Sequence, residues 1–193
     1  MKSKHIVCGF NYRFGKGGSG DTELLRKLCK KNNIGISIIP PITVDGITVS
    51  SSEIRTAIEN GNVELAEKLL GRPYSLRAKV INGKHLGHTL GFPTVNQEFE
   101  GGKAVPLYGV YLTRTRIDKK TKYGITNIGI QPTVNANRLY AETNIFDFSG
   151  DLYGKIITVE FLRFLRTERK FDSVDDLKAQ ISNDVQKAKN MLI

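Results

Sequence analysis

The sequence predicts an α/β segment followed by an all-β domain that ends in a helix. Strand-like and helix-like stretches alternate over residues 1–73, a pattern typical of a parallel sheet with packed helices. Beyond residue 73 the stretches are short, rich in β-branched and aromatic residues, and separated by turn residues. A helical apolar stripe lies near the C-terminus. We therefore divide the chain into residues 1–73 and 74–193, and expect the second part to be a small barrel or sandwich.

The α/β segment contains two strand candidates and three helix candidates. Residues 5–10 and 36–44 are short, apolar and extended in character. Asp21 is placed to cap the helix between them, and Gly35 to end it. Ser50 stands three residues before a glutamate, the capping-box spacing that begins the second helix, and a shorter helix follows it.

Strand candidates dominate the second part. They are residues 75–82, 108–117, 122–130, 139–148 and 154–164. In the last of them Ile157, Val159 and Phe161 share one face, which is therefore apolar. The closing helix begins near Ser173, and its stripe consists of Val174, Leu177, Ile181, Val185, Ala188 and Leu192. We interpret this stripe as a face that packs on the core.

The composition excludes several classes of protein. The chain has 193 residues, of which 39% are hydrophobic and 25% charged, as is ordinary for a globular protein. No apolar run approaches the roughly 20 residues of a membrane span, and the N-terminus lacks a secretory pattern. Cys8 and Cys29 have no CxxC spacing, so a disulfide framework is not expected. We expect a cytoplasmic protein without a membrane partner.

The net charge is +10, from 29 basic and 19 acidic residues. Such an excess favours an anionic partner, whether nucleotide, nucleic acid or phosphate, although a basic surface can also serve solubility alone. The basic residues are scattered along the chain, and there is no tryptophan for base stacking. We therefore expect no nucleic-acid partner.

The segment GHTLGFPTVN, residues 87–96, is the first candidate site. Gly87 and Gly91 permit the close backbone approach that phosphate groups need, and Pro93 stiffens the step that follows. Thr94 and Asn96 share a face if the chain is extended here, and their oxygens would suit Mg²⁺ beside a nucleotide. The same residues could instead form only a strand entry at a barrel corner. Spacing alone leaves both interpretations open.

Glu142 is the second candidate. It lies within the strand candidate 139–148, where Tyr140, Glu142 and Asn144 share one face. A carboxylate held among aromatic residues on a strand could act as a general base. A single glutamate on a barrel strand is more often simply solvated, so the pattern alone does not assign the role.

Taken together, these motifs resemble the riboflavin kinase module of the bacterial bifunctional riboflavin kinase/FAD synthetase family. That module carries GRxLGFPTAN, a GVY strand, NIGxRPTF, an acidic ETH strand followed by DLYG, and LRxExKF before the last helix. The chain has, in the same order, GHTLGFPTVN, YGVYL, NIGIQPTV, AETNIFDF with GDLYGK, and FLRTERKFDS. Each motif alone is weak, whereas their order over more than half of the chain is specific.

The resemblance implies a six-stranded Greek-key barrel with a closing helix, and ATP-dependent phosphorylation of riboflavin to FMN. It implies that Thr94 and Asn96 bind Mg²⁺ and the phosphates of ATP. The segment from Gly87 to Gly91, with Pro93, would lie over the nucleotide.

The resemblance also assigns the flavin side of the site. Glu142 would be the general base for the ribityl hydroxyl of riboflavin. Arg166, which matches the arginine of LRxExKF, would lie near the flavin.

Three positions depart from the family pattern. His88 replaces an arginine, Gln131 replaces the arginine of NIGxRPTF, and Asn144 replaces the histidine of the ETH strand. Each change removes a potential cation near an anionic ligand, which favours weaker nucleotide binding. Because the implied metal ligands and base are kept, we still expect riboflavin kinase activity.

Residues 1–73 resemble the second half of the FMN adenylyltransferase domain of the same family. CGFNYRFGKGGSG is similar to its GxDFRFGxxxxG loop, with Asn11 in place of the aspartate. VSSSEIR is similar to its ISSTxIR motif, which would place Ser51, Ser52 and Arg55 near a nucleotide. The HxGH motif of that domain has no match in the chain. We therefore expect no adenylyltransferase activity. The incomplete sheet predicts either self-association or pairing with another chain, or a lower stability of residues 1–73 than of the barrel.

Two other functions stay open at this point. The three lost cations favour a non-catalytic flavin- or nucleotide-binding module. The incomplete first part favours one piece of a split FAD synthetase. Formation of FMN from riboflavin, ATP and Mg²⁺ distinguishes an active kinase from a binding module.

Overall fold

The computed structural model describes residues 3–83, 91–99, 101–118, 120–132 and 137–192, without the side chains of residues 131, 132 and 137. The chain divides into two compact units, Met1–Val49 and Ser50–Ile193. The sequence changes character near residue 73, but the compact units separate earlier. The reason is that Val63 belongs to the core of the second unit and Leu107 donates its backbone N–H to Ile58 O at 3.3 Å. A boundary between family modules near residue 73 stays a prediction.

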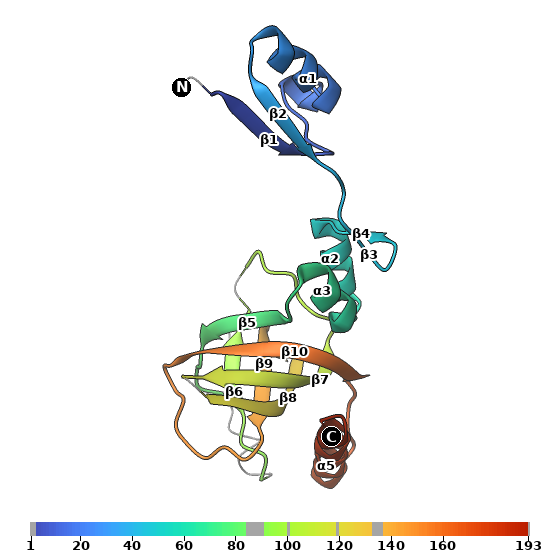
Figure 1. Ribbon diagram of the computed structural model, residues 1–193. Coiled ribbons are helices and arrows are strands. Elements are labelled where there is room, and N and C mark those ends of the chain that lie inside the picture. Colours follow the sequence, from blue (N-terminus) through green and yellow to red (C-terminus); the bar gives the residue numbers. More distant parts are fainter. Residues whose placement is uncertain (1–2, 84–90, 100, 119, 133–136, 193) are drawn as a thin grey trace. The chain divides into compact units, whose positions relative to one another are not determined.

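The first unit is built from a parallel pair of strands and one long helix (Figure 1). Its elements are β1 (His5–Gly9), η1 (Lys16–Gly18), α1 (Thr22–Lys31), β2 (Gly35–Ile39), β3 (Thr43–Val44) and β4 (Ile47–Thr48). β1 and β2 run in parallel from His5 opposite Gly35 to Gly9 opposite Ile39. This is the βαβ connection that alternating strand and helix patterns predict.

The ends of α1 follow from its flanking residues. Asp21 caps the first turn, because its carboxylate accepts the backbone N–H of Leu24 at 2.9 Å. This hydrogen bond lowers the pKa of the Asp21 carboxyl. The helix ends at Lys31, with Asn33 in the left-handed region at a φ of 54°. The prediction that Gly35 ends the helix was wrong, since an asparagine tolerates this conformation and Gly35 instead begins β2.

In the second unit, two helices come before a six-stranded antiparallel sheet that curves into a barrel (Figure 1). Its helices are α2 (Ser51–Glu59), α3 (Val63–Leu70) and α5 (Val174–Asn190). Its strands are β5 (Tyr74–Lys79), β6 (Val95–Glu98), β7 (Gly109–Ile117), β8 (Lys120–Pro132), β9 (Asn137–Ile145) and β10 (Ile156–Thr167). The order across the sheet is β5-β10-β7-β8-β9-β6, so the predicted barrel with a closing helix is confirmed.

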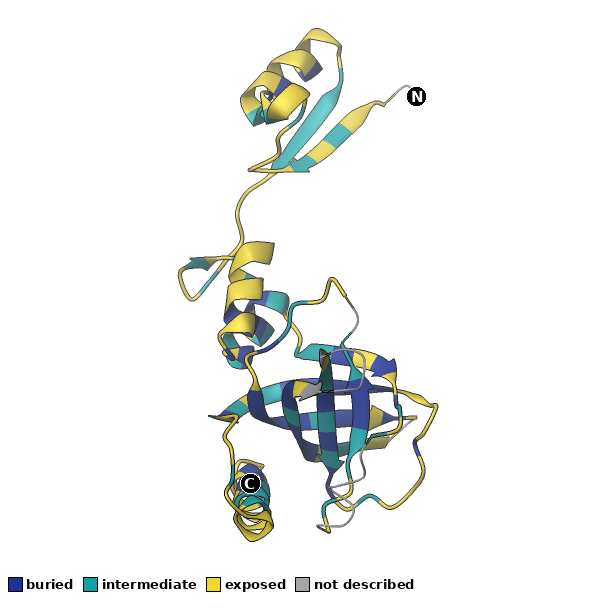
Figure 2. Cartoon of the chain, turned by 180° about the vertical axis from the view of Figure 1, so that it is seen from behind, coloured by how far each residue is buried: buried dark blue, intermediate teal, exposed yellow. Residues whose placement is uncertain are grey.

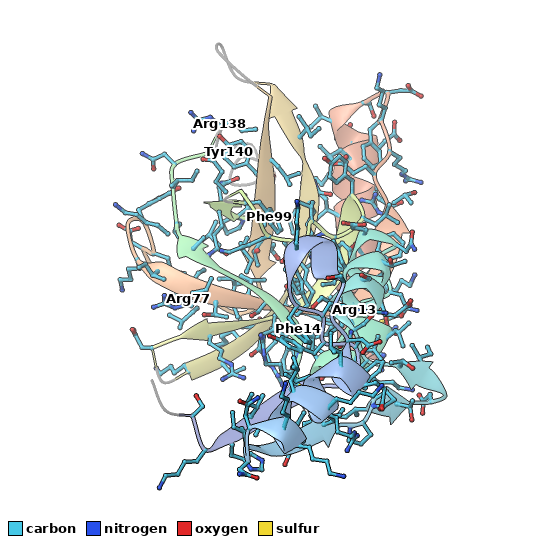
Figure 3. All side chains as sticks on the ribbon, turned by 90° about the horizontal axis from the view of Figure 1, so that it is seen from above. Arg13, Phe14, Arg77, Phe99, Arg138 and Tyr140 are labelled. Carbon is cyan, nitrogen blue, oxygen red and sulfur yellow. The ribbon has the colours of Figure 1, made fainter. Side chains whose placement is uncertain are left out.

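The barrel nearly closes where β6 approaches β5. Ile81, just beyond β5, donates its backbone N–H to Asn96 O at 2.9 Å. Gln97 spans the remaining gap, because its side-chain amide donates to Ala78 O at 2.8 Å and to Ile157 O at 3.1 Å. On the other side of β6, Arg138 of β9 donates to a Glu98 carboxylate oxygen at 3.2 Å, next to Tyr140 (Figure 3). Side chains therefore complete the closure that the strand ladder leaves open.

Alternation along each strand separates an inner and an outer face of the barrel. The inner face is mostly buried and centres on Phe161, with the ring of Tyr111 edge-on at 5.4 Å. Three threonine hydroxyls join neighbouring strands inside it: Thr113 to Thr126 at 2.8 Å and Thr126 to Thr143 at 2.9 Å. The other members of this core are Val63, Leu76, Ala78, Val80, Ile117, Ile128, Ala141, Ile145, Leu152, Ile157 and Val159.

The outer face of β7, β8 and β10 forms a second apolar layer with α5. Val110, Leu112, Ile125, Phe146, Leu165 and Ala188 form its buried centre. Ile181 and Val185 of α5 pack against this centre, which confirms that the predicted stripe is a packing face. The two ends of the predicted stripe do not take part, because Val174 is 59% exposed and Leu192 38%, so the packed part of the stripe runs from Ile181 to Ala188. Within the described part of the chain, no helix is long and apolar enough to cross a membrane.

Candidate active site

A cleft of about 260 Å³ opens between the outer face of the barrel and α5. Its lining comes from the segment before β6, from β7, β8, β9 and the end of β10, from the segment after β10, and from α5. The residues are Phe92, Thr94, Val110, Ile125, Asn127, Glu142, Asn144, Arg166, Glu168, Arg169, Phe171, Leu177, Ile181 and Asp184. Predicted site residues from three separate motifs, namely Thr94, Glu142 and Arg166, thus meet in one place.

Glu142 reaches this cleft because of its position on β9. Ala141, Thr143 and Ile145 point into the core, so Glu142 points outward, as the predicted alternation requires. The register places Glu142 opposite Asn127 of β8 and opposite Asn96 of β6. Directly opposed residues share a face, so the carboxylate lies in a row between two amide side chains.

Thr94 stands at the entrance to β6, directly after Pro93. Asn144 of β9 donates its side-chain amide to Pro93 O at 2.8 Å, which ties the segment to the sheet. Both Thr94 and Asn144 line the cleft. The position where the family has a histidine therefore acts here as a neutral hydrogen-bond donor to the backbone of the threonine motif.

Asn96 lies beside Glu142 but does not line the cleft. It is 6% exposed, and Gly83 lies against its side-chain amide so closely that a Cβ at position 83 would collide with it. A glycine is therefore required where the backbone crosses Asn96. The structure thus keeps Thr94 and Asn96 on one face, with Thr94 at the cleft surface and Asn96 covered.

The structure describes Gly91 of this motif but not Gly87. Gly91 adopts a φ of 83°, a backbone conformation that favours glycine. Gly87 and His88 lie outside the described residues, and so does the side chain of Gln131.

Arg166 is directed into the cleft by irregular pairing of β10. The register between β10 and β7 shifts twice, the second time between Phe164 and Arg166, and Arg166 then pairs with Val110. Such bulges re-aim side chains, often next to active sites. Gly109 makes this possible, because a Cβ there would collide with the carbonyl oxygen of Arg166.

Ser51, Ser52 and Arg55 lie on α2, away from this cleft. Ser50 caps the helix by accepting the backbone N–H of Glu53 at 3.2 Å, as predicted. Ser51 and Arg55 line a second cavity of about 350 Å³ with Arg72, Tyr74 and Ser75, among others. Ser52 is not part of its lining. The two cavities share no lining residue, so the structure does not bring this motif to Glu142.

Several lining residues were not predicted from the sequence. Asn127 donates to a Glu168 carboxylate oxygen at 3.3 Å, and Phe171 lies beneath two guanidinium groups. Asp184 is only 3% exposed. A signal for Asp184 was available, because it stands seven residues after Leu177, on the apolar stripe itself, where a carboxylate needs a buried partner.

Beside the carboxylate of Glu142, the metal ligands implied by the sequence are the neutral oxygens of Thr94 and Asn96. Among the described residues, no group of three His, Cys, Asp or Glu side chains could hold a metal. The hydroxyl of Thr94 and the amide of Asn96 are hard ligands of the kind that Mg²⁺ accepts alongside nucleotide phosphates. These residues therefore fit a magnesium ion brought with a nucleotide better than a permanently bound metal.

Comparisons with known proteins show which families the two parts of the chain match. The riboflavin kinase family model matches residues 70–192, and the FAD synthetase family model matches residues 1–53. The bifunctional riboflavin kinase/FMN adenylyltransferase of Bacillus subtilis is 37% identical over 191 residues, covering 97% of this chain and 60% of that protein. The enzyme of the same description from Escherichia coli K12 is 36% identical over 185 residues, covering 95% of this chain and 59% of that protein.

A solved structure matches over nearly the same range. It is a crystal structure from Streptococcus pneumoniae described as a macrolide-efflux protein, with a TM-score of 0.84 and 36% identity, covering 97% of this chain and 60% of that chain. The chain therefore spans about 60% of the length of these relatives. The riboflavin kinase model covers the whole barrel and the closing helix, and on this evidence the chain belongs to the riboflavin kinase family.

Proposed function

We propose that the chain transfers the γ-phosphoryl group of ATP to the 5′-hydroxyl of the ribityl chain of riboflavin, giving FMN and ADP. The observation that carries the proposal is the meeting of Thr94, Glu142 and Arg166 in one cleft of the barrel. The cleft also offers apolar walls, from residues such as Ile125, Phe171 and Ile181, that suit a flat aromatic ring.

Glu142 is the general base in this proposal. Its carboxylate takes the proton from the ribityl hydroxyl, the oxygen bonds to the γ-phosphorus, and the bond from that phosphorus to the departing ADP oxygen breaks. A positioned base of this kind contributes about 10²–10⁴-fold to a rate. Phosphoryl transfer otherwise depends on alignment and charge neutralisation.

Thr94 and Asn96 hold the nucleotide side of the site. Their oxygens would bind Mg²⁺, which when present neutralises charge on the β- and γ-phosphates. Thr94 faces the cleft and Asn96 lies behind it, next to Glu142. Pro93 and Gly91 shape the turn that leads to Thr94, and we propose that this turn and Gly87 contact ATP.

The experiment is to incubate purified protein with riboflavin, ATP and Mg²⁺ and to separate the flavins by chromatography. FMN formation that requires all three components is the expected result. A folded protein that binds riboflavin but makes no FMN would show instead a non-catalytic flavin-binding module.

Adenylyl transfer from ATP to FMN is not expected from residues 1–193 alone. In the related family the reaction uses an early histidine motif together with the later serine-arginine motif, and only Ser51, Ser52 and Arg55 match here. Each missing electrostatic contact of this kind costs about 3–4 kcal/mol in the transition state. Supplying FMN, ATP and Mg²⁺ and assaying FAD and pyrophosphate tests the point, and sustained FAD synthesis would overturn it.

The sheet of the first unit is proposed to pair with another strand, from a second copy or from a separate FAD synthetase piece. Within the described residues, β1 and β2 pair only with each other. Val7 is 65% exposed and Ile39 47%, whereas parallel strands are normally covered on both faces. Light scattering should show a concentration-dependent dimer that Val7→Lys weakens, and a strict monomer at high concentration would exclude self-association.

The proposed location of this activity is the cytoplasm. Both cysteines, Cys8 and Cys29, are free thiols, as expected in a reducing compartment. Fractionation of the source cells with an antibody against the chain would test this location.

A further inference from the structure

One wall of the cleft contains a buried carboxylate that no motif points to. Asp184, on α5, is 3% exposed and lies against Arg166 at the end of β10. Nε of Arg166 donates to both carboxylate oxygens, at 3.1 and 2.9 Å, and Nη2 lies 2.8 Å from Oδ2. This forked contact fixes the plane of the guanidinium and not only its distance.

The contact extends into a ring of side chains around Phe171. Gln180 donates its side-chain amide to Asp184 Oδ1 at 2.7 Å and accepts a hydrogen bond from Arg169. The guanidinium carbons of Arg166 and Arg169 lie 5.9 and 4.7 Å from the centre of the Phe171 ring. Asp184 thus holds one arginine directly and the other through Gln180, and both contact the same aromatic ring.

These contacts also compensate the charge of Arg166 in this wall of the cleft. The carboxylate of Asp184 compensates the guanidinium of Arg166, and Nη1 of Arg166 is further occupied by Thr167 O at 2.9 Å. Because its guanidinium is already paired, Arg166 is less available to bind a phosphate than an unpaired arginine would be. A neutralised guanidinium beside an aromatic ring suits an uncharged, flat, polar-edged ligand, and the ring system of riboflavin is one.

We propose that Asp184 is a positioning residue for the flavin ring. It sets the orientation of Arg166 and, through Gln180 and Arg169, the position of Phe171, so that the cleft has a flat wall in which the charge of Arg166 is already compensated before the flavin arrives. This inference rests on the proposed riboflavin kinase function and adds the residue that organises its flavin side. Asp184 does not take part in proton or phosphoryl transfer.

The test is Asp184→Asn, which keeps the shape of the side chain and removes its charge. Losing a hydrogen-bonded charge contact should raise KM for riboflavin by about tenfold to a hundredfold, with kcat and the KM for ATP changed far less. Asp175→Asn is the matched control, because Asp175 is an exposed carboxylate in the first turn of the same helix and does not line the cleft. It should leave all three constants unchanged.

Two further variants separate positioning from folding. The pair Arg166→Met with Asp184→Met replaces a buried ion pair by apolar side chains, which proteins often tolerate without losing stability. This variant should melt near the parent temperature and still bind riboflavin weakly. Asp184→Glu, which keeps the charge, should recover part of the affinity. If Asp184→Asn itself unfolds, the paired variant decides the question.

Riboflavin binding followed by flavin fluorescence keeps the inference separate from the proposed function. If the parent binds riboflavin but makes no FMN, the kinase proposal fails, and the same affinity ratios still test Asp184. If the parent makes FMN and either Asp184→Asn or the paired variant binds riboflavin as well as the parent, the positioning role is overturned. A parent that does not bind riboflavin at all overturns both.

Discussion

The two compact units of this chain differ in how far the strands of their β-sheets are paired and buried. In the barrel unit, each strand has a partner on both sides or is closed by side chains such as Gln97, and many residues of its strands are buried (Figure 2). In the first unit, β1 and β2 form a sheet of two strands, and of the described residues 3–49 only Gly20, Leu25 and Cys29 are buried. A chain can therefore carry two matched family regions of which only one forms a closed core.

This difference bears on where chemistry can be supported. Catalytic side chains must be held within about half an ångström of a productive geometry by rigid surroundings. Glu142 and Arg166 stand on strands whose neighbours are paired and whose opposite faces are packed. In the first unit, β1 and β2 pair only with each other among the described residues, and few of these residues are buried. We therefore expect activity to depend on the barrel and to be insensitive to changes in the first unit.

The largest expected effect comes from Glu142→Gln. Removing the basic carboxylate while keeping its shape should lower kcat for FMN formation by about 10²–10⁴-fold, with riboflavin affinity nearly unchanged. Glu23→Gln, which changes an exposed glutamate on α1 of the first unit, is the control and should have no effect. Equal turnover in parent and Glu142→Gln would exclude the assigned base.

Thr94→Val should have the next largest effect. The substitution removes one hydroxyl ligand at nearly constant volume, so KM for Mg·ATP should rise by about tenfold to a hundredfold. The KM for riboflavin should change little. If ATP use is normal and only the melting temperature falls, Thr94 serves strand entry alone.

Hydrogen exchange should resolve the two units directly. Amides of β1 and β2 should exchange at least about tenfold faster than those of β7 and β8, because local opening there exposes little apolar surface. Mass spectrometry of peptic fragments reports both regions in one experiment. Similar protection in both regions would mean that the first unit is stabilised by a contact outside its own fold, such as a second copy.

The smallest expected effect is the loss of the Asp21 cap on α1 at low pH. Hydrogen bonding to Leu24 lowers the pKa of Asp21 below its ordinary value of 3.8. A lowered folded-state pKa means that the stabilisation is present above pH about 4 and is lost as the pH falls through the folded value. The protection of the α1 amides, taken relative to their intrinsic exchange rate at each pH, should therefore fall below pH about 4, and Asp21→Asn, which caps without titrating, should remove this loss of protection. An unchanged pH dependence in this variant would place the titrating group elsewhere.

Sequence reasoning predicted the elements that local rules control. The alternation on β9 separated the face of Glu142 from that of Thr143, and Ser50, Asp21 and Ser173 cap helices as their spacing indicated. These features depend on a few neighbouring residues, so a single sequence contains them. The assignment of Thr94 and Asn96 to Mg²⁺ and of Glu142 to proton abstraction stays a prediction.

The features that the sequence did not predict depend on tertiary contacts. The register shifts in β10 that aim Arg166 leave no mark in the apolar pattern, and Asp184 becomes meaningful only once α5 is packed beside that strand. The separation at Val49 rather than near residue 73 likewise follows from packing of α2 and α3, which composition does not report. Long-range pairing decided each of these features.

Inward and outward residues alternate along β8 and β9, and this has a consequence for how the protein can change. Thr126 and Ile128 serve the interior while Ile125 and Asn127 serve the cleft, and on the next strand Thr143 faces inward between Glu142 and Asn144. Substitutions that improve the packing of the interior and substitutions that change the ligand would therefore fall at different positions, although these positions are neighbours in the sequence. A library of variants mutated only at outward positions could therefore change ligand specificity while leaving the core residues of the barrel unchanged.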